Sequence, residues 1–232
     1  MTLNGGIRFI NNGLKTSIRA MQVQSTLIDI ANDNIEGFDK VGYQRKEAIT
    51  SAFTEYLGVN GISTTADDKV GRIANTGNPL DLALATKGYF QIQSEEGIKL
   101  TRDGRFKLDK EGNLLTLEGA KVLSESGMPI KLSVIPENLK HVVVNSKGGL
   151  SVFNKATNKL EHVANIGVVD SNGILLMRPE VKQGYNEYSN VSLEREFLGM
   201  MAPLKAFDAN RQIFMIENSN LAKTISQLGS AS

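Results

Sequence analysis

The chain has 232 residues, no cysteine and a formal net charge of +1, and 41% of its residues are hydrophobic. This length accommodates one or two domains with a sizeable core, the lack of cysteine excludes a disulfide framework and cysteine zinc sites, and the near-neutral charge gives no electrostatic basis for binding nucleic acid. The sequence contains no apolar run near the roughly 20 residues that span a bilayer.

The N-terminal region has the pattern of an amphipathic helix. Its main apolar positions recur every seven residues, at Ile7, Leu14, Met21, Ile28 and Ile35. Gly37 follows as a residue type that commonly ends a helix. The periodicity predicts a helix from about residue 7 to 34, within a first segment at 1–36. Charged residues interrupt the apolar positions, so we expect no cleaved signal peptide.

Residues 37–75 are expected to form a connector. Between Gly37 and Arg45, turn-forming residues alternate with Phe38 and Tyr43, which predicts an ordered turn leading into an extended segment. A short helix at 48–56 is one interpretation of the next stretch. The polar, turn-rich residues 60–75 indicate a linker.

From about Thr76 the apolar period changes to two, which is typical of strands. Short alternating runs are separated by turn signals such as Asp103-Gly104 and Glu118-Gly119. They predict a central domain of antiparallel strands at 76–185. The expected strands contain Leu80, Leu82, Leu84, Phe90, Ile92, Ile98, Leu100, Phe106, Leu108, Ile130, Leu132, Val142, Val144, Leu150, Val152 and the runs 166–169 and 174–177.

The last segment, 186–232, predicts a second long helix. One line of residues spaced by seven is entirely apolar: Leu193, Met200, Phe207, Phe214, Leu221 and Leu228. A neighbouring line contains Phe197, Leu204 and Ile225 beside Arg211 and Asn218. Residues 189–192 offer helix caps. Pro203 predicts either a kink or a helix whose regular part begins near that proline.

The matching stripes at the two ends predict an α+β fold in which the N- and C-terminal helices pair as a coiled-coil-like domain next to the β-domain. Stripes of this length need a partner helix in the same chain, in another copy, or in both. Ordinary packing of two helices on a globular core is the simpler alternative. The expected assembly interface consists of Ile7, Leu14, Met21, Ile28, Ile35, Leu193, Phe197, Met200, Leu204, Phe207, Phe214, Leu221, Ile225 and Leu228.

Residues suited to catalysis or metal binding are sparse. His141 and His162 are the only histidines, and neither has a second ligand at metal spacing. The stretch 109–114 lacks the glycine and the closing glutamate of a calcium loop, so it predicts a hairpin turn. We therefore expect no cofactor, no metal and no small-molecule substrate. The enzymatic alternative is a β-scaffold acting on peptidoglycan through a carboxylate pair, Asp103 with Asp109 or Glu111.

A series of short motifs runs along the whole chain. Residues 30–35 read I-A-N-D-N-I and residues 42–45 read G-Y-Q-R; L-D-L-A at 80–83, G-Y-F at 88–90, T-R-D-G-R-F at 101–106 and G-N-L-L-T at 112–116 follow in order. This series resembles that of bacterial flagellar rod and hook proteins, whose N-terminal signature is I-A-N-N-[LI]-A-N-x-x-T-x-G-[FY]-K-R. The motif residues are Asn32, Asn34, Gly42, Tyr43, Asp81, Gly88, Phe90, Thr101, Arg102, Gly104, Phe106, Ser189 and Asn190.

The chain departs from the family pattern at four places. Asp33 replaces an asparagine, and residues 36–38, 86–88 and 202–205 differ from the usual motifs. These departures affect the course of both helices near positions 36 and 203. They leave the sevenfold apolar spacing intact.

The resemblance implies a non-enzymatic structural subunit of the flagellar basal-body rod, of the proximal or the distal kind. In such proteins the paired terminal helices stack helically into a hollow, torque-transmitting axial shaft. The implied partners are copies of the same chain, other rod and hook proteins and the flagellar type III export apparatus. The implied location is the periplasmic part of the basal body, reached without a cleaved signal peptide. A hook subunit or another axial filament subunit is the alternative.

Overall fold

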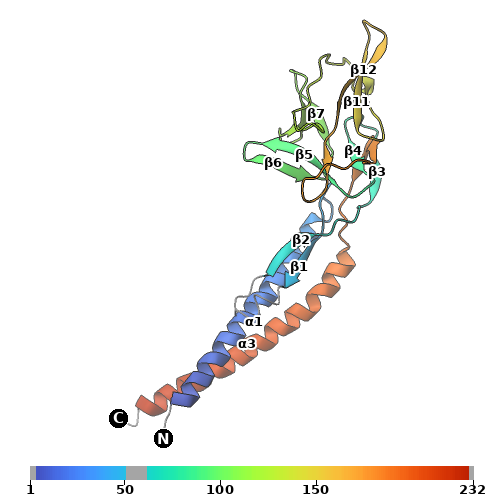
Figure 1. Ribbon diagram of the computed structural model, residues 1–232. Coiled ribbons are helices and arrows are strands. Elements are labelled where there is room, and N and C mark those ends of the chain that lie inside the picture. The colour runs from blue at the N-terminus through green and yellow to red at the C-terminus, as the bar shows by residue number, and fades with distance from the viewer. Residues whose placement is uncertain (1–3, 51–61, 230–232) are drawn as a thin grey trace. The chain divides into compact units, whose positions relative to one another are not determined.

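The computed structural model describes residues 4–50 and 62–229, and the side chains of residues 13–49 and 62–228. The chain divides into two compact units (Figure 1). The helical unit comprises Met1–Glu36, Lys46–Ala66 and Ser192–Ser232, and the β-unit comprises Gly37–Arg45 and Asp67–Val191. The described elements are α1 (Asn4–Gly37), β1 (Lys46–Thr50), β2 (Ile62–Ala66), β3 (Ile73–Asn75), β4 (Leu82–Leu84), β5 (Tyr89–Ser94), β6 (Gly97–Thr101), β7 (Phe106–Leu108), β8 (Leu114–Thr116), β9 (Lys121–Val122), η1 (Leu139–His141), β10 (Val142–Val144), β11 (Gly149–Asn154), β12 (Lys159–Asn165), β13 (Val168–Val169), β14 (Val181–Gln183), β15 (Tyr185–Glu187) and α3 (Leu193–Gly229).

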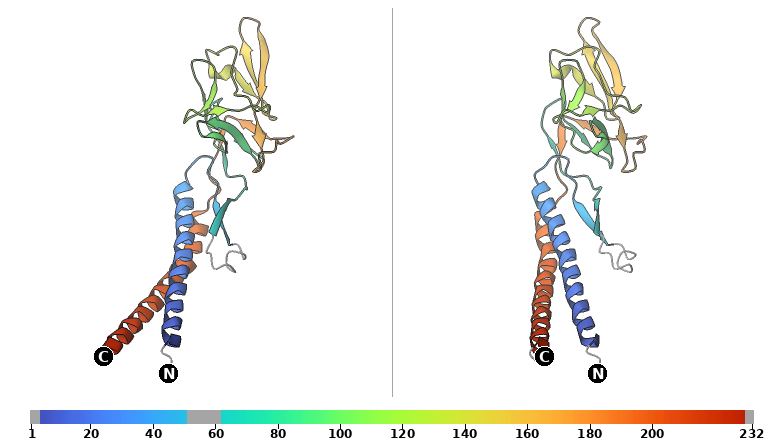
Figure 2. Two further views of the ribbon diagram at one scale, coloured as in Figure 1. Left: turned by 60° about the vertical axis from the view of Figure 1, so that its left-hand side comes forward. Right: turned by 90° about the vertical axis from the view of Figure 1, so that its left-hand side faces the viewer.

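The helical unit contains the two long helices and one hairpin. Figure 2 shows α1 and α3 close together over part of their length, and in both views they diverge toward the N- and C-terminal ends. Ser192 caps α3, because its Oγ accepts a hydrogen bond from the backbone N–H of Arg195 at 3.4 Å. The helix continues through Pro203, so the expectation that its regular part begins near this proline is wrong. Strands β1 and β2 pair antiparallel, with Lys46 opposite Ala66 and Thr50 opposite Ile62.

Two interpretations of the connector are wrong. Residues 48–50 belong to strand β1 instead of a short helix, and the remainder of that predicted helix, 51–56, lies outside the described residues. The expected linker contains β2 and β3. Because β2 pairs with β1 and β3 pairs with β15, these polar strands are stabilised by distant partners and not by a local apolar pattern.

The β-unit consists of antiparallel strands, as the sequence predicts. Its largest sheet has six strands in the order β13-β5-β9-β8-β7, with β6 paired to β5. A three-stranded sheet has the order β10-β11-β12, and β14 pairs with β4. The expected strands around Ile130 and Leu132 and at 174–177 are not observed. Residues 129, 131 and 175 make only isolated β-bridges. Ile130 and Leu132 are buried nonetheless.

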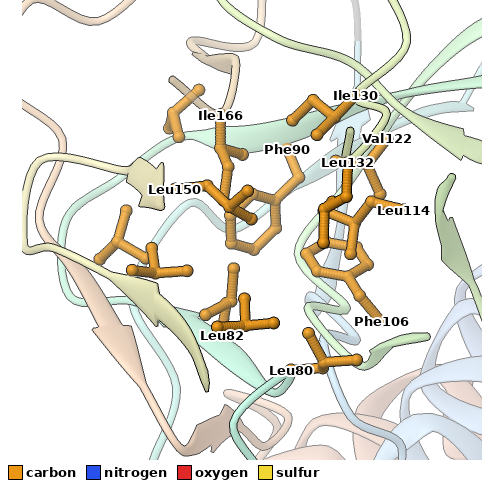
Figure 3. Close-up of a cluster of buried hydrophobic side chains, with 14 of the residues drawn as sticks. Leu80, Leu82, Phe90, Phe106, Leu114, Val122, Ile130, Leu132, Leu150 and Ile166 are labelled. Atoms are coloured by element: carbon orange, nitrogen blue, oxygen red, sulfur yellow. The ribbon is translucent and has the colours of Figure 1, made fainter. Parts of the chain in front are cut away.

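One hydrophobic core connects the sheets of the β-unit. Figure 3 shows side chains from both the six-stranded sheet and its neighbours pointing into this cluster. The rings of Phe90 and Phe106 lie at its centre, 5.3 Å apart and edge to face at 81°, a favourable aromatic geometry. Leu82, Leu150 and Ile166 complete the contact, each at most 2% exposed. The α+β class with two terminal helices and a central antiparallel domain is therefore confirmed.

Candidate functional site

Asn34 joins three elements of the helical unit. Its side-chain oxygen accepts a hydrogen bond from the backbone N–H of Lys46 at 2.7 Å. Its amide nitrogen donates to the Lys46 carbonyl at 2.9 Å and to Glu196 Oε2 at 3.1 Å. The Asn34 side chain is fully buried, so an unbonded amide at this position would be costly. Asn34 thus ties the end of α1 to the start of β1 and the first turn of α3.

Gly42 and Tyr43 shape the turn at Gly37–Arg45 within the β-unit. Gly42 has φ +71°, and a Cβ added to it would clash with the backbone nitrogen of Asp103. The Tyr43 ring lies directly against Gly37, where a Cβ would overlap ring carbons. Glycine is therefore required at both positions by the close approach of neighbouring groups.

Arg102 and Glu187 form a buried ion pair in the β-unit. Arg102 Nε and Nη2 lie 2.7 and 2.5 Å from Glu187 Oε2. The guanidinium also donates to the carbonyls of Leu84, Thr86 and Gly88, at distances of 2.7 to 3.1 Å. The second carboxylate oxygen of Glu187 accepts a hydrogen bond from the backbone N–H of Gly71 at 2.8 Å. This network joins four separate segments of the chain and satisfies both charges.

Asn190 connects the segments by which the chain enters and leaves the β-unit. Its side-chain oxygen accepts from the backbone N–H of Arg45 at 2.7 Å. Its amide donates to the carbonyls of Asp67 at 2.9 Å and Lys69 at 3.0 Å. The neighbouring Ser189 Oγ accepts from the Val191 N–H at 3.2 Å. These bonds join three backbone segments, at Arg45, at 67–69 and at Asn190.

The remaining motif residues have structural positions in the β-unit, with one exception in α1. Asp81 is buried and accepts from Asn78 Nδ2 at 2.8 Å, and Thr101 Oγ1 accepts from the Asp103 N–H at 3.0 Å. A Cβ on Gly104 would overlap the carbonyl oxygen of Leu82. Asn32, in α1, is exposed. The motif residues other than Asn32 therefore hold the fold together, and a surface for partners has to be sought elsewhere.

Helix α3 offers that surface, because it is apolar on two sides. The sevenfold line Leu193, Met200, Phe207, Phe214 and Leu221 is half-buried. By contrast, exposed fractions are 56% for Phe197, 45% for Leu204, 61% for Ile225 and 44% for Leu228. Met201 and Leu198 are exposed beside Phe197 and Leu204. We call Phe197, Leu198, Met201 and Leu204 the outer patch of α3.

Helix α1 presents a different distribution. Its predicted interface residues Leu14, Met21, Ile28 and Ile35 are half-buried, and the side chain of Ile7 lies outside the described residues. Among the described side chains of α1, Ile18 is the single large apolar residue classed as exposed. The apolar surface left open in the helical unit is therefore contributed mainly by α3.

The carboxylates considered for catalysis have structural partners. Asp103 binds Arg105, with Oδ2 2.6 Å from Nη2. Asp109 closes the turn between β7 and β8 by accepting from the N–H groups of Glu111 and Asn113 at 3.0 and 2.7 Å. The side-chain hydrogen bond from Asn113, with these backbone bonds, lowers the pKa of Asp109. Among the described residues, no cluster of three or more His, Asp or Glu side chains is arranged to hold a metal ion.

Sequence reasoning missed two residues of the helix contact. Glu196 is absent from the predicted interface, yet it is 3% exposed and bonded to Asn34. Gly13 is also absent from the predicted interface, yet it lies against the carboxylate of Glu217. A signal for Glu196 does exist: it falls three residues after Leu193 and four before Met200, which is the alternation of a helix seam.

Comparison with known proteins extends the resemblance over the chain. The family description "Flagellar hook protein FlgE/F/G D1 domain" matches residues 83–152. The flagellar basal-body rod protein FlgG of Bacillus subtilis is 26% identical over 91% of this chain and 97% of its own length. The rod protein FlgF of Rhizobium meliloti is 26% identical over 95% of this chain and 99% of its own length, and FlgF of Caulobacter vibrioides is 28% identical over 93% and 85%. No helix among the described residues is both long and apolar enough to cross a membrane.

Proposed function

We infer that this chain is a structural subunit of the bacterial flagellar basal-body rod, because its likeness to rod proteins includes the β-unit and both terminal helices. That likeness covers 95% of this chain and 99% of a rod protein of nearly equal length, and this observation carries the proposal. The predicted resemblance to the flagellar rod and hook family is confirmed by these relatives.

The proposed mechanism is mechanical. A shaft that transmits torque needs extensive contacts between subunits and no reactive group. A contact between two different surfaces of one chain does not close on itself and therefore generates a helical filament. The outer patch of α3 is proposed to supply one of these surfaces, and the half-buried apolar stripes of α1 and α3 are proposed to pair as a coiled-coil-like inner domain. Leu228 and Ile225, both exposed near the end of α3, would be covered in the assembly.

The remaining proposals follow from the same relationship. The subunit would sit in the periplasmic part of the basal body, after passage through the flagellar type III export apparatus. Its partners would be copies of itself and other rod or hook proteins. Identity is 26% to both a FlgG and a FlgF relative. Identity therefore does not distinguish positions along the rod, and we propose to distinguish them by copy number.

The hook subunit is the second candidate, because the family description that matches residues 83–152 includes the hook protein. The rod is favoured because rod proteins match over 97% and 99% of their own lengths.

The test is quantitative mass spectrometry of basal bodies purified from the source bacterium, together with a deletion strain. We expect the chain in the rod fraction of wild-type particles, and we expect the deletion strain to lack complete flagella until the gene is restored. Its copy number relative to the hook protein would separate a short proximal segment from the distal rod. Absence of the chain from purified particles would overturn the proposal.

A further inference from the structure

Two contacts between α1 and α3, one hydrogen bond and one close approach, belong to one antiparallel register. Asn34 Nδ2 donates to Glu196 Oε2 at 3.1 Å. Toward the other end of the pair, a Cβ on Gly13 would lie 3.2 Å from Glu217 Oε1. Going back from Asn34 to Gly13 and forward from Glu196 to Glu217 covers three heptads on each helix. The two contacts therefore agree on the same alignment.

This alignment predicts two further facing pairs between the ends. Ala20 lies opposite Asn210, and Leu27 lies opposite Pro203, at heptad intervals from the observed contacts. All four residues are half-buried, as a seam between two helices requires. Two lines of residues on α3 thus face α1. One is the apolar line, and the other consists of Glu196, Pro203, Asn210 and Glu217, which are polar except for the proline.

The apolar residues alone would not determine this alignment. Leu193, Met200, Phe207, Phe214 and Leu221 recur every seven residues, and so do Leu14, Met21, Ile28 and Ile35. A slide of one heptad therefore pairs apolar residues with apolar residues again. The polar line removes this degeneracy, because a slide of one heptad in one direction places the Glu196 carboxylate against Leu27. A buried carboxylate without a hydrogen-bond donor is strongly disfavoured.

The backbone of Lys46 orients the Asn34 amide for this role. Since Lys46 N–H donates to Asn34 Oδ1 and the Lys46 carbonyl accepts from Nδ2, the amide cannot flip without losing both bonds. It consequently presents an N–H group toward α3, and the matching residue there must be an acceptor. We propose that Asn34 and Glu196 are positioning residues that set the register of α1 against α3.

Disulfide mapping tests this proposal directly, because the chain contains no cysteine. One cysteine is always placed on α3, at Asn210→Cys. The second is placed on α1. Ala20→Cys reports the proposed register, and Gly13→Cys and Leu27→Cys report a slide of one heptad in either direction. The purified full chain is oxidised at low concentration, and mass spectrometry measures the fraction linked within one chain. We expect the Ala20→Cys pair to link at least fivefold more than either shifted pair.

The same three pairs are then measured with Glu196→Leu and with the matched control Glu196→Gln. The leucine variant removes the acceptor and makes the contact with Leu27 favourable, so it is expected to raise the Gly13→Cys pair at the expense of the central one. The glutamine variant keeps an acceptor oxygen and is expected to retain the original distribution. Dominant linkage of a shifted pair in the unsubstituted background, equal linkage of all three, or an unchanged distribution in Glu196→Leu would each overturn the proposal. The test does not depend on the flagellar assignment, so its failure would leave that assignment untouched.

Discussion

Breaking the buried ion pair between Arg102 and Glu187 is expected to destabilise the β-unit more than breaking an exposed pair does. Arg102→Met would leave the Glu187 carboxylate buried without its cation, and breaking one partner of a buried pair typically costs about 3–5 kcal/mol. We expect a loss of this size in the free energy of unfolding, measured by denaturant titration with circular dichroism.

The matched control is Lys87→Met, which removes the cation of a pair with Asp68 whose side chains are 67% and 56% exposed. Exposed pairs contribute little, so this variant is expected to unfold at nearly the wild-type denaturant concentration. Equal midpoints for Arg102→Met and Lys87→Met would contradict the role assigned to the buried pair.

Tyr89 is expected to titrate later than an ordinary tyrosine. Burial raises the pKa of Tyr89 above its usual value of 10.0, although the positive charge of Arg102 acts in the opposite direction. The folded chain therefore keeps this proton at a pH where the unfolded chain has lost it. Any stability linked to Tyr89 is present below pH 10.0 and is lost as the pH rises through the folded pKa.

The difference in tyrosinate absorbance between wild type and Tyr89→Phe isolates this single titration. We expect its midpoint above pH 10.0, and a midpoint at or below that value would contradict the effect of burial. Loss of the 2.6 Å hydrogen bond to Gln44 in the variant is expected to cost about 1 kcal/mol at neutral pH.

At the residue scale, sequence reasoning found the motif positions without their contacts. The stretch 101–106 was selected through family resemblance, yet the partner of Arg102 is Glu187, which lies far along the chain in strand β15. A sequence motif identifies a residue, whereas its partner is determined by the path of the chain between them. Asn34 is a similar case, because its bonds to the Lys46 backbone depend on a turn and not on any side-chain pattern.

At the scale of elements, long regular patterns were predictable and short polar strands were not. The helices follow from many repeats of a seven-residue spacing, each of which adds to the signal. Strands β2 and β3 contain few apolar residues and depend on pairing with β1 and β15. On α3, counting apolar residues placed Phe197, Leu204 and Ile225 beside the main stripe, whereas the line that faces α1 contains Glu196 and Glu217. Whether the Phe197 line is an interface between copies stays a prediction.

Pro203 provides a prediction for α3 as an element. A proline inside a helix has no N–H group to donate to the carbonyl four residues earlier, which here belongs to Gly199, and it costs about 3 kcal/mol relative to alanine. Pro203→Ala is therefore expected to raise helix content and to stabilise α3 by up to about this amount. Circular dichroism during thermal unfolding measures both effects.

Pro136→Ala is the control, because Pro136 lies in a loop of the β-unit and not in a helix. It is expected to leave the helical signal unchanged. If Pro203→Ala also leaves that signal and its melting temperature unchanged, the expected cost of the proline in α3 is contradicted.

For the whole molecule, the two units have different physical designs. The β-unit has a buried core, and its charged and amide motif side chains are bonded internally. Both units leave large apolar side chains exposed, but in the helical unit most of them lie on one helix, α3, where 56% of Phe197 and 63% of Leu198 are exposed. A helix that is apolar on more than one face is typically buried in its working state. The exposed run of apolar residues on α3 therefore favours assembly through the helices.

The outer patch of α3 allows assembly to be separated from folding. Phe197→Ser with Leu204→Ser is expected to leave the unfolding of the isolated chain nearly unchanged, because both side chains are already largely exposed. The same double variant is expected to abolish self-association in sedimentation velocity and to fail to restore motility in a deletion strain.

The control is Ile98→Ser with Leu160→Ser, which removes two comparably exposed apolar residues, 64% and 54%, from the β-unit. Wild-type association of the Phe197 and Leu204 variant would contradict an assembly role for the patch, whereas equal loss in both double variants would indicate general surface hydrophobicity as the cause. Loss confined to the α3 variant would mean that subunits recognise this face of the helix, since the two variants remove the same kind of surface from different units.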